Sequence, residues 1–512
     1  MENIGDEKQK TPEGHLELTA EILRAEILRE EKPVEMGLLT SSSSGEHLKD
    51  EDERNLDRAL SSPVPGQKDY RLYRMRFVTL AIFCMFSMSN AFQWIEFVII
   101  ENIVAEYYGV SHFAVEWTSM IYMVSYIPLI FPGAWFLEKY GLRIAMIIGA
   151  AGTAAGSWLK LLGTDPSSFI WAFAGQTLVA WSQVFVLGIP PHLAAHWFGP
   201  QELSTATAVG VFGNQLGIAL GFLVPPMMIP VDGDVETKKR AFTKLFLTGA
   251  VFTAVIFVLI MALVKDSAPT PPSAARDRQL LSAREDSHQG SGKKFLQSVF
   301  HLLFKHKGYK LLFLTYGINV GVFYAISTLL NKMLVAHYED VEKHAGVIGL
   351  SFVVSGMVGS VVCGVIMDKT HKYKETTLTV YCLSLISFGL YTFALPFGSL
   401  PFVYVGAIIV GFFMTGYLSV GFELAAEITY PEAEGTTSGL LNASAQIFGL
   451  VVTSASSFAM DTIGTVYTLL VLAGLLFVGC IGTYLIPNDL RRSLGEVGGQ
   501  ELQKKAGEEE IA

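Results

Sequence analysis

Charged side chains are scarce in this sequence: they make up 16% of its 512 residues, whereas hydrophobic residues make up 51%. Soluble globular chains carry about a quarter charged residues, so this composition excludes that class and favours a protein with several membrane-spanning helices. Lys and Arg are missing from the middle of every long apolar run, and Lys160 and Lys332 stand near the ends of runs. A carrier of organic anions needs a buried cation, so that class of carrier is disfavoured.

Cysteine is also rare, with four residues in the whole chain. All four lie inside apolar runs, which favours packing over disulfides or metal ligands. The segment 1–67 is polar and lacks the apolar stretch of a signal peptide, so the first spanning helix is expected to act as the targeting signal. The net charge of −10 lies mostly in tails and loops, and nucleic-acid binding is therefore not expected.

Twelve apolar runs are each long enough to cross a bilayer as a helix, which predicts an all-α membrane protein. A polar gap divides the runs six and six. The expected domains are a disordered cytoplasmic tail over 1–67, a six-helix lobe over 68–265, a cytoplasmic linker over 266–308, a second lobe over 309–487 and a cytoplasmic tail over 488–512. The expected spans are about 75–100, 114–137, 143–163, 168–195, 203–229, 243–264, 310–334, 345–367, 376–397, 400–424, 437–460 and 465–486.

The orientation of the chain is predicted from Lys and Arg in the short segments that flank the spans. Basic residues precede span one, occupy the loops after spans two and eight and the central gap, and follow span twelve. All of these fall on one side of the membrane if both ends of the chain are cytoplasmic. The basic cluster 238–240 falls on the other side and is outnumbered.

Two short loops repeat an acid–base pattern at an offset of about 230 residues. A second pair of acids, at the start of spans five and eleven, repeats at a similar offset. An acid near a helix end, with bases that reach the neighbouring helix, would hold two helices together and release them when the lobes move. We therefore predict a latch, whose candidate residues are Glu138, Lys139, Arg143, Asp368, Lys369, Glu202 and Glu434.

The first span carries polar and aromatic residues, and the polar ones are costly to expose to lipid. The stretch 90–96 (NAFQWIE) should face a cavity or a neighbouring helix. Trp94 in this stretch has a counterpart in Tyr324, about 230 residues later in span seven. Two aromatic faces at matching places in two lobes are typical of a site for a cation. The alternative is that both aromatics only pack helices together, and the residues alone leave it open.

Buried acids are expected only at Glu96 and Glu423, with Glu427 near a helix end. Each is a candidate proton or cation site, and the alternative for Glu423 is a structural or gating role. No acid–base relay is visible, so facilitated diffusion is the simpler mechanism. His192 and His196 have a metal-compatible spacing but stand at a span end, so no metal and no cofactor are expected. No nucleophile–base arrangement stands among the spans, so an enzyme is not expected.

The two repeated loops approximate the signature G-x-L-a-D-R-x-G-R-K, so the chain resembles the major facilitator superfamily, which implies two pseudo-symmetric lobes around a midplane site. Over roughly residues 72–492 it is similar to the feline leukaemia virus subgroup C receptor family. The matching stretches are NAFQW (90–94), IPLIFP (127–132), QVFVLG (183–188), WFGP (197–200), GNQLG (213–217), STLLN (327–331), GFFMTGY (411–417) and SGLLNASAQIFG (438–449). The sequence departs from the family at Glu96, where Gln is usual, at 191–192, where Ser-Arg is usual, and at Ser419, where Pro is usual.

This resemblance implies a carrier of choline and, in some members, of ethanolamine. Export of haem is the alternative activity, and a cell-surface receptor that transports nothing is the alternative from another class. The choline-contacting positions that the resemblance implies are Trp94, Gln183, Tyr324 and Gln446, with Asn90, Trp117, Tyr122 and Met123 nearby. We therefore expect a monomer in the lipid bilayer of the plasma membrane, which takes up its substrate by alternating access.

Overall fold

The computed structural model describes residues 72–199, 202–268, 270, 299–339, 341–397, 399–430, 432 and 434–488. The tail expected over 1–67, most of the linker and most of the C-terminal tail lie outside the described residues. Within the described part the chain is almost wholly helical and has no strand. The structure thus confirms the predicted all-α class for the part of the chain that it describes.

Twelve helices of the described residues are long and apolar enough to cross a membrane, which confirms the predicted number. These spans are Met75–Tyr108, His112–Leu137, Lys139–Gly163, Phe169–Leu187, Thr205–Met228, Val235–Leu263, Lys307–Val335, Glu342–Met367, Tyr373–Ala394, Leu400–Thr429, Thr436–Ile463 and Thr465–Tyr484.

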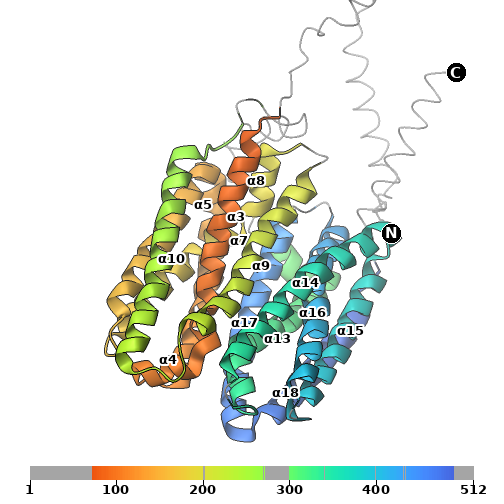
Figure 1. Cartoon of the computed structure of the whole chain (residues 1–512). Coiled ribbons are helices and arrows are strands. Elements are labelled where there is room, and N and C mark those ends of the chain that lie inside the picture. The colour runs from red at the N-terminus through yellow and green to blue at the C-terminus, as the bar shows by residue number, and fades with distance from the viewer. Residues whose placement is uncertain are drawn as a thin grey trace, which may run out of the picture. The chain divides into compact units, whose positions relative to one another are not determined.

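The first six spans pack mainly against one another and form the N-terminal lobe, in which α3 lies along α9 while α5 contacts α6 and α10 (Figure 1). The elements of this lobe are α3 (Met75–Ile95), η1 (Val98–Ile100), α4 (Glu101–Tyr108), α5 (His112–Lys160), η2 (Leu161–Gly163), α6 (Phe169–Ser182), α7 (Val184–Leu187), α8 (Ile189–Trp197), α9 (Leu203–Met228) and α10 (Val235–Leu263).

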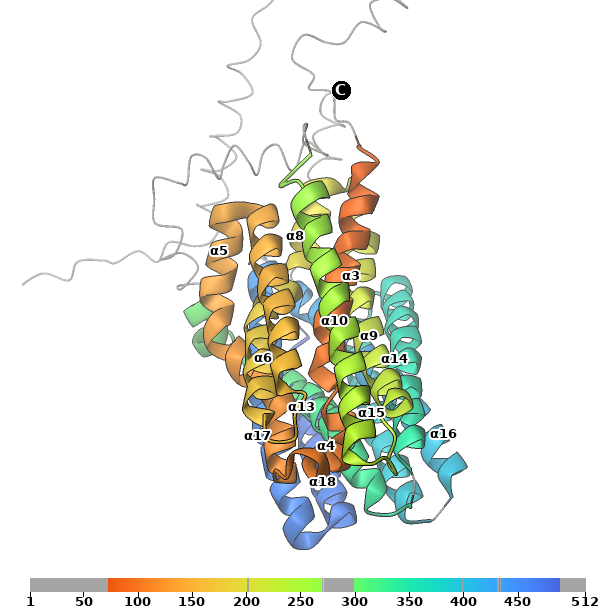
Figure 2. The ribbon, with the colours of Figure 1, turned by 60° about the vertical axis from the view of Figure 1, so that its left-hand side comes forward.

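The last six spans form the C-terminal lobe, in which α14 packs against α16 and α13 packs against α17. Its elements are η3 (His301–Lys305), α13 (Lys307–Val335), α14 (Glu342–Thr370), α15 (Tyr373–Ala394), η4 (Leu395–Phe397), α16 (Leu400–Thr429), α17 (Glu434–Ile463) and α18 (Thr465–Tyr484). The lobes meet mainly where α9 contacts α14 and where α5 contacts α17. The helices of both lobes run roughly along one common direction, as the turned view shows (Figure 2).

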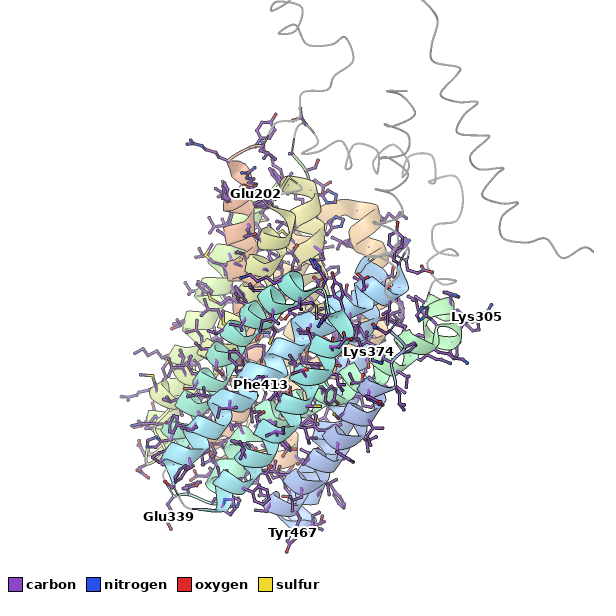
Figure 3. The ribbon with its side chains drawn as sticks, turned by 90° about the vertical axis from the view of Figure 1, so that its right-hand side faces the viewer. Glu202, Lys305, Glu339, Lys374, Phe413 and Tyr467 are labelled. Carbon is purple, nitrogen blue, oxygen red and sulfur yellow. The ribbon has the colours of Figure 1, made fainter. Side chains whose placement is uncertain are left out.

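The bundle has two ends, which we name by the chain. The terminal end is the end at which α3 begins and α18 ends, and the far end is the opposite one. Glu202 lies at the terminal end, whereas Glu339 and Tyr467 lie at the far end (Figure 3). Because each span runs from one end to the other, the loops alternate between the two ends in chain order.

Glycines set the close approach of helices inside each lobe. A Cβ atom on Gly217 would collide with the backbone of Met88, so α9 can lie directly on α3 only because this position has no side chain. In the same way a Cβ on Gly359 would collide with the backbone of Phe412, where α14 lies on α16. Small residues at such crossings give membrane helices the van der Waals contact that replaces a hydrophobic driving force in lipid.

Candidate substrate site between the lobes

Span one is interrupted directly after Trp94. Helix α3 ends at Ile95, a turn follows at 96–97, and η1 then leads into α4. Ile100, the last residue of η1 and the N-cap of α4, leaves helical geometry with φ −122° and ψ 35°. Interrupted helices are tolerated in membranes only where neighbouring groups satisfy the freed backbone, and in transporters they are found at substrate sites. The break therefore gives Trp94 a position at which a binding site is expected.

The predicted partner of Trp94 lies directly against it. The rings of Trp94 and Tyr324 meet edge to face, with centroids 5.2 Å apart and ring planes at 76°. Trp94 belongs to the N-terminal lobe and is 5% exposed, and Tyr324 belongs to α13 of the C-terminal lobe. The side-chain amide of Gln446, on α17, donates to the hydroxyl of Tyr324 at 3.5 Å. The structure thus brings together three of the four positions implied for choline.

Met123 lies beside the same tyrosine. A Cβ atom on Gly449 of α17 would stand 2.7 Å from Cδ2 of Tyr324 and 3.1 Å from the sulfur of Met123. Gly449 therefore leaves the space that both side chains occupy. Tyr122, the neighbour of Met123 on α5, is fully buried. The α5 face that carries Met123 consequently forms a wall of the candidate site.

The fourth implied position, Gln183, lies at a second interruption. It separates α6 from α7 in span four, and its backbone amide bonds back three residues, to the carbonyl of Ala180 at 3.2 Å. Among the described residues, the side-chain oxygen of Gln183, the indole nitrogen of Trp94 and the hydroxyl of Tyr122 are buried without a hydrogen-bond partner. An unpaired buried polar group costs roughly 1–3 kcal/mol, so native proteins keep few of them. These three atoms therefore have unused hydrogen-bonding capacity.

Asn90 and Trp117 are placed differently. The amide nitrogen of Asn90 donates to the hydroxyl of Thr153 at 3.3 Å and to the carbonyl of Val179 at 3.1 Å, which ties α3 to α5 and α6. Trp117 stands edge-on to Phe113, one turn earlier on α5, with centroids 6.2 Å apart. The contacts of Asn90 are thus structural within the N-terminal lobe.

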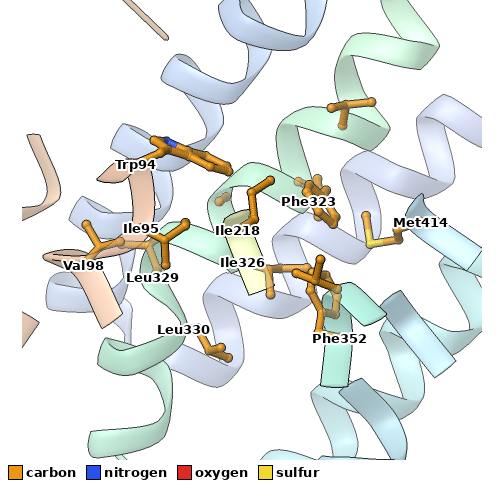
Figure 4. Close-up of a cluster of buried hydrophobic side chains, with 14 of the residues drawn as sticks. Trp94, Ile95, Val98, Ile218, Phe323, Ile326, Leu329, Leu330, Phe352 and Met414 are labelled. Atoms are coloured by element: carbon orange, nitrogen blue, oxygen red, sulfur yellow. The ribbon is translucent and has the colours of Figure 1, made fainter. Parts of the chain in front are cut away.

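An apolar cluster joins the two lobes next to the aromatic pair (Figure 4). Trp94, Ile95 and Val98 of the N-terminal lobe lie beside side chains from α9, α13, α14 and α16 in this cluster. Its other labelled members are Ile218, Phe323, Ile326, Leu329, Leu330, Phe352 and Met414. Close packing here excludes water, which strengthens any electrostatic interaction in the neighbouring site.

A salt bridge joins the lobes closer to the far end. Lys332 of α13 donates to the carboxylate of Glu116 on α5 at 3.0 Å and to the hydroxyl of Ser457 on α17 at 3.0 Å. It also lies 3.1 Å from Asp461. Glu116 is fully buried and accepts a further hydrogen bond from Ser457 at 2.6 Å. The buried carboxylate is therefore held between two elements of the other lobe.

Further polar contacts continue this connection. Asn102 of α4 donates to Glu342 at 2.7 Å and accepts from Asn331 at 2.9 Å, and the hydroxyls of Ser119 and Thr328 lie 3.0 Å apart. We call the whole set the far-end band, and it consists of Asn102, Glu116, Ser119, Thr328, Asn331, Lys332, Glu342, Ser457 and Asp461.

The sequence interpretation missed this band and was wrong about the buried acids. Glu96 is buried as expected, and Glu427 is buried too. Glu101, Glu116 and Glu342 are buried without having been expected, whereas Glu423, which was expected to be buried, is exposed. The reason is that an acid near a span end can be covered by the other lobe, and a helix position alone does not say which lobe covers it. A signal was present in Lys332, a cation near a span end that needs an anionic partner.

The predicted latch is described only in part. The side chains of Glu138, Asp368 and Glu434 lie outside the described residues, and Lys369 is exposed. Glu202 binds Arg76 at 3.0 Å, and Lys139 lies over the ring of Trp135 at 4.6 Å. The backbone amide of Arg143 donates to Asp266 at 3.1 Å and its guanidinium donates to the carbonyl of Met261 at 3.2 Å, which joins α5 to the end of α10. The latch itself stays a prediction.

Comparison with known proteins supports a family assignment. A family model described as the Major Facilitator Superfamily matches residues 79–398. The zebrafish (Danio rerio) choline/ethanolamine transporter flvcr2b is 43% identical over 467 residues, which cover 90% of this chain and 94% of that protein. The human choline/ethanolamine transporter FLVCR2 is 43% identical over 441 residues, which cover 86% of this chain and 82% of that protein.

Solved structures support the fold. A bacterial homologue of the human lysosomal transporter Spinster, in an inward-facing and unoccupied conformation, matches with a TM-score of 0.62 and 13% identity over 82% of this chain and 99% of that chain. FucP, a transporter of the major facilitator superfamily, matches in its outward conformation with a TM-score of 0.58 and 13% identity, over 81% of this chain and 100% of that chain. The chain therefore belongs to the major facilitator superfamily and, within it, to the feline leukaemia virus subgroup C receptor family.

Proposed function

We propose that this protein takes up choline, and also ethanolamine, through a site between the lobes at Trp94 and Tyr324. The observation that carries this proposal is the contact of these two rings across the lobe boundary, with centroids 5.2 Å apart. A quaternary ammonium group donates no hydrogen bond and is only loosely hydrated, so its natural receptor is an aromatic face within about 6 Å, worth roughly 0.5–2 kcal/mol per ring. The names of the relatives, which are choline/ethanolamine transporters, support the choice of cargo.

The edge-to-face contact explains how a cation would enter the site. The positive edge of one ring lies against the negative face of the other, which is the attraction that a cation itself exploits. If the two rings moved slightly apart, a bound ammonium group would take the place of the positive ring edge and would lie against the negative face of the other ring. The unpaired oxygen of Gln183 and the amide of Gln446 would then receive the hydroxyl end of choline.

Transport by alternating access requires that the lobes separate at one end at a time. We propose that the terminal end is cytoplasmic, as the basic flanks predict, and that the far-end band is the outer gate. The ion pair of Lys332 with the buried Glu116, at 3.0 Å, would hold that gate closed and would have to break before it opens. We also propose that the acid–base loops around Glu138 and Asp368 form the cytoplasmic latch, and that a monomer in the plasma membrane is the working unit.

The simplest source of energy for the uptake of this cation is the membrane potential, which can drive facilitated diffusion without a coupled ion. One positive charge that enters the cell gains about 2.3 kcal/mol per 100 mV of inside-negative potential, which corresponds to roughly 50-fold accumulation. No proton-coupling step is needed for this gradient to drive uptake.

The test is the uptake of radiolabelled choline by cells that lack their own choline carriers, with and without this protein, at two membrane potentials. We expect saturable uptake that weakens on depolarisation and is reduced by excess ethanolamine. The absence of uptake from cells with the protein at their surface would contradict the proposal and would bring haem export or a receptor role forward.

A further inference from the structure

A buried ion pair lies inside the N-terminal lobe, away from the far-end band. The ammonium group of Lys160, near the end of α5, donates to the carboxylate of Glu96, in the break that follows α3. Lys160 is 1% exposed and Glu96 is 4% exposed, and both belong to membrane-spanning segments. The same ammonium group lies 5.6 Å from the centre of the Phe97 ring. Neither charge is accounted for by the proposed path of the substrate.

The pair borders the proposed substrate site. Glu96 stands two residues after Trp94 in the sequence. Phe97, whose ring lies next to the Lys160 ammonium group, belongs to the same buried cluster as Trp94 and Tyr122. Buried polar side chains of the same two helices are also bonded to each other, since the hydroxyl of Ser157 on α5 donates to the side-chain oxygen of Gln93 on α3 at 3.0 Å. No bulk water separates charges at such depth, so the field of an uncompensated charge would reach the site only weakly screened.

The sign of the charges is what matters for a cationic cargo. A protonated Lys160 without Glu96 would place a positive charge close to a site that binds another positive charge. With Glu96 present the pair carries no net charge, whether the proton stays on the amine or passes to the carboxylate. We infer that Glu96 is a specificity-determining residue, the counter-charge that prevents Lys160 from repelling a cationic substrate at Trp94. This inference rests on the proposed function and deepens it.

A purely structural role of the pair predicts something different. In that case the ion pair only holds the break after α3 against α5, and removal of either partner would damage the site in the same direction. Buried pairs that lose one partner are usually destabilised for this reason. The electrostatic role predicts that removal of Glu96 weakens the binding of a charged substrate and that removal of Lys160 strengthens it. It also predicts that neither removal changes the binding of an uncharged molecule of the same shape.

The experiment compares E96Q, K160Q and the double variant in the choline uptake assay. The KM for choline is measured together with the inhibition constant of 3,3-dimethylbutan-1-ol, in which a carbon atom replaces the nitrogen of choline and removes its charge. We expect E96Q to raise the KM for choline roughly tenfold, because the charge of a protonated Lys160 would then be uncompensated and only weakly screened at this depth. K160Q should lower this KM, the double variant should restore it to within about twofold, and the inhibition constant of the uncharged alcohol should stay constant in all three.

The single variant E96Q decides the question even if K160Q does not reach the cell surface. Gln has nearly the same size and shape as Glu and carries no charge, so E96Q is expected to fold and to change affinity rather than transport itself. Equal shifts for choline and for the uncharged alcohol in E96Q, or shifts in the same direction in both single variants, would overturn the inference. If the unaltered protein takes up no choline, the proposed function fails instead, so the two failures are distinguishable.

Discussion

The ring of Trp94 rests against the ring of Tyr324 although the two residues belong to different lobes, and their centroids lie 5.2 Å apart. Each ring is fixed to its own lobe, Trp94 next to the break after α3 and Tyr324 by the bond from Gln446 on α17. Any change in the separation of the lobes therefore changes the distance between the two aromatic faces. If a cation binds between these rings, as we propose, its affinity would depend on how far apart the two lobes stand.

The aromatic pair should be necessary for uptake. We expect W94A and Y324A each to reduce the uptake of choline at least tenfold, because each removes one cation–π contact and opens the dry site to water. W94F should retain part of the activity, because a smaller aromatic face remains. The measurement is radiolabelled uptake normalised to the protein at the cell surface.

The matched control for these variants is W171A. Trp171 lies on α6 and is 48% exposed, so its removal should leave uptake within about twofold of the unaltered protein. Normal uptake by W94A or by Y324A would show that the rings pack the lobes together without binding the cargo.

A disulfide across the far-end band should keep the two lobes together at this end. The hydroxyl oxygens of Ser119 and Thr328 lie 3.0 Å apart across the lobe boundary, so the side chains of cysteines at these positions are expected to meet and to form a disulfide. In S119C/T328C we expect an oxidant to abolish choline uptake and a reductant to restore it, because the outer gate cannot open while the bond is intact. Uptake before and after each treatment is the measurement.

The single variants S119C and T328C are the controls for this cross-link, and the oxidant should leave their uptake unchanged. They also account for the four native cysteines, which are present in every variant. If the cross-linked double variant still transports choline at the normal rate, separation of the lobes at the far end is not part of the mechanism.

Much of this architecture could be predicted from the sequence, because it depends on local properties. A run of about 20 apolar residues specifies a spanning helix whatever its neighbours are, and all twelve spans were found in this way. The pairing of Trp94 with Tyr324 followed from the repeat of the two halves, since equivalent positions in related lobes face the same central axis.

The polar contacts between and within the lobes could not be predicted in the same way. Glu96 pairs with Lys160 64 residues away, and Glu116 pairs with Lys332 216 residues away, so no periodic pattern connects the partners. Which acid becomes buried depends on which helix of the other lobe covers it. For this reason Glu116 was overlooked, and Glu423, which is exposed, was wrongly expected to be buried.

Gly449 should be required for the shape of the site. A Cβ atom there would stand 2.7 Å from Tyr324 and 3.1 Å from Met123, so G449A must displace one of these side chains. We expect this variant to fold and to raise the KM for choline at least about threefold, since close-packed interiors respond to a single added methyl group by local shifts. G389A is the control, because no atom lies within 4 Å of a Cβ at Gly389 on α15. Equal KM values for the two variants would mean that the ring of Tyr324 does not determine affinity.

Lys332 should determine how often the far end opens. In K332Q the carboxylate of Glu116, which is fully buried, loses its cation, and a buried charge without its partner typically costs about 3–5 kcal/mol. The closed arrangement of the band is therefore destabilised relative to the open one, in which water reaches Glu116. The reporter is a cysteine at position 328, which a membrane-impermeant maleimide can label only when the far end is open. We expect T328C/K332Q to be labelled at least tenfold faster than T328C.

Two variants of the same network make this prediction specific. D461N should change the labelling rate less than about fivefold, because Asp461 is 64% exposed and an ion pair at such a position contributes at most about 1 kcal/mol. E116Q/K332Q should be labelled more slowly than K332Q, because it removes the unpaired charge together with the cation. If K332Q is labelled as slowly as its parent, the ion pair does not hold the gate, and the closure of the far end has to be attributed to the apolar cluster beside Trp94.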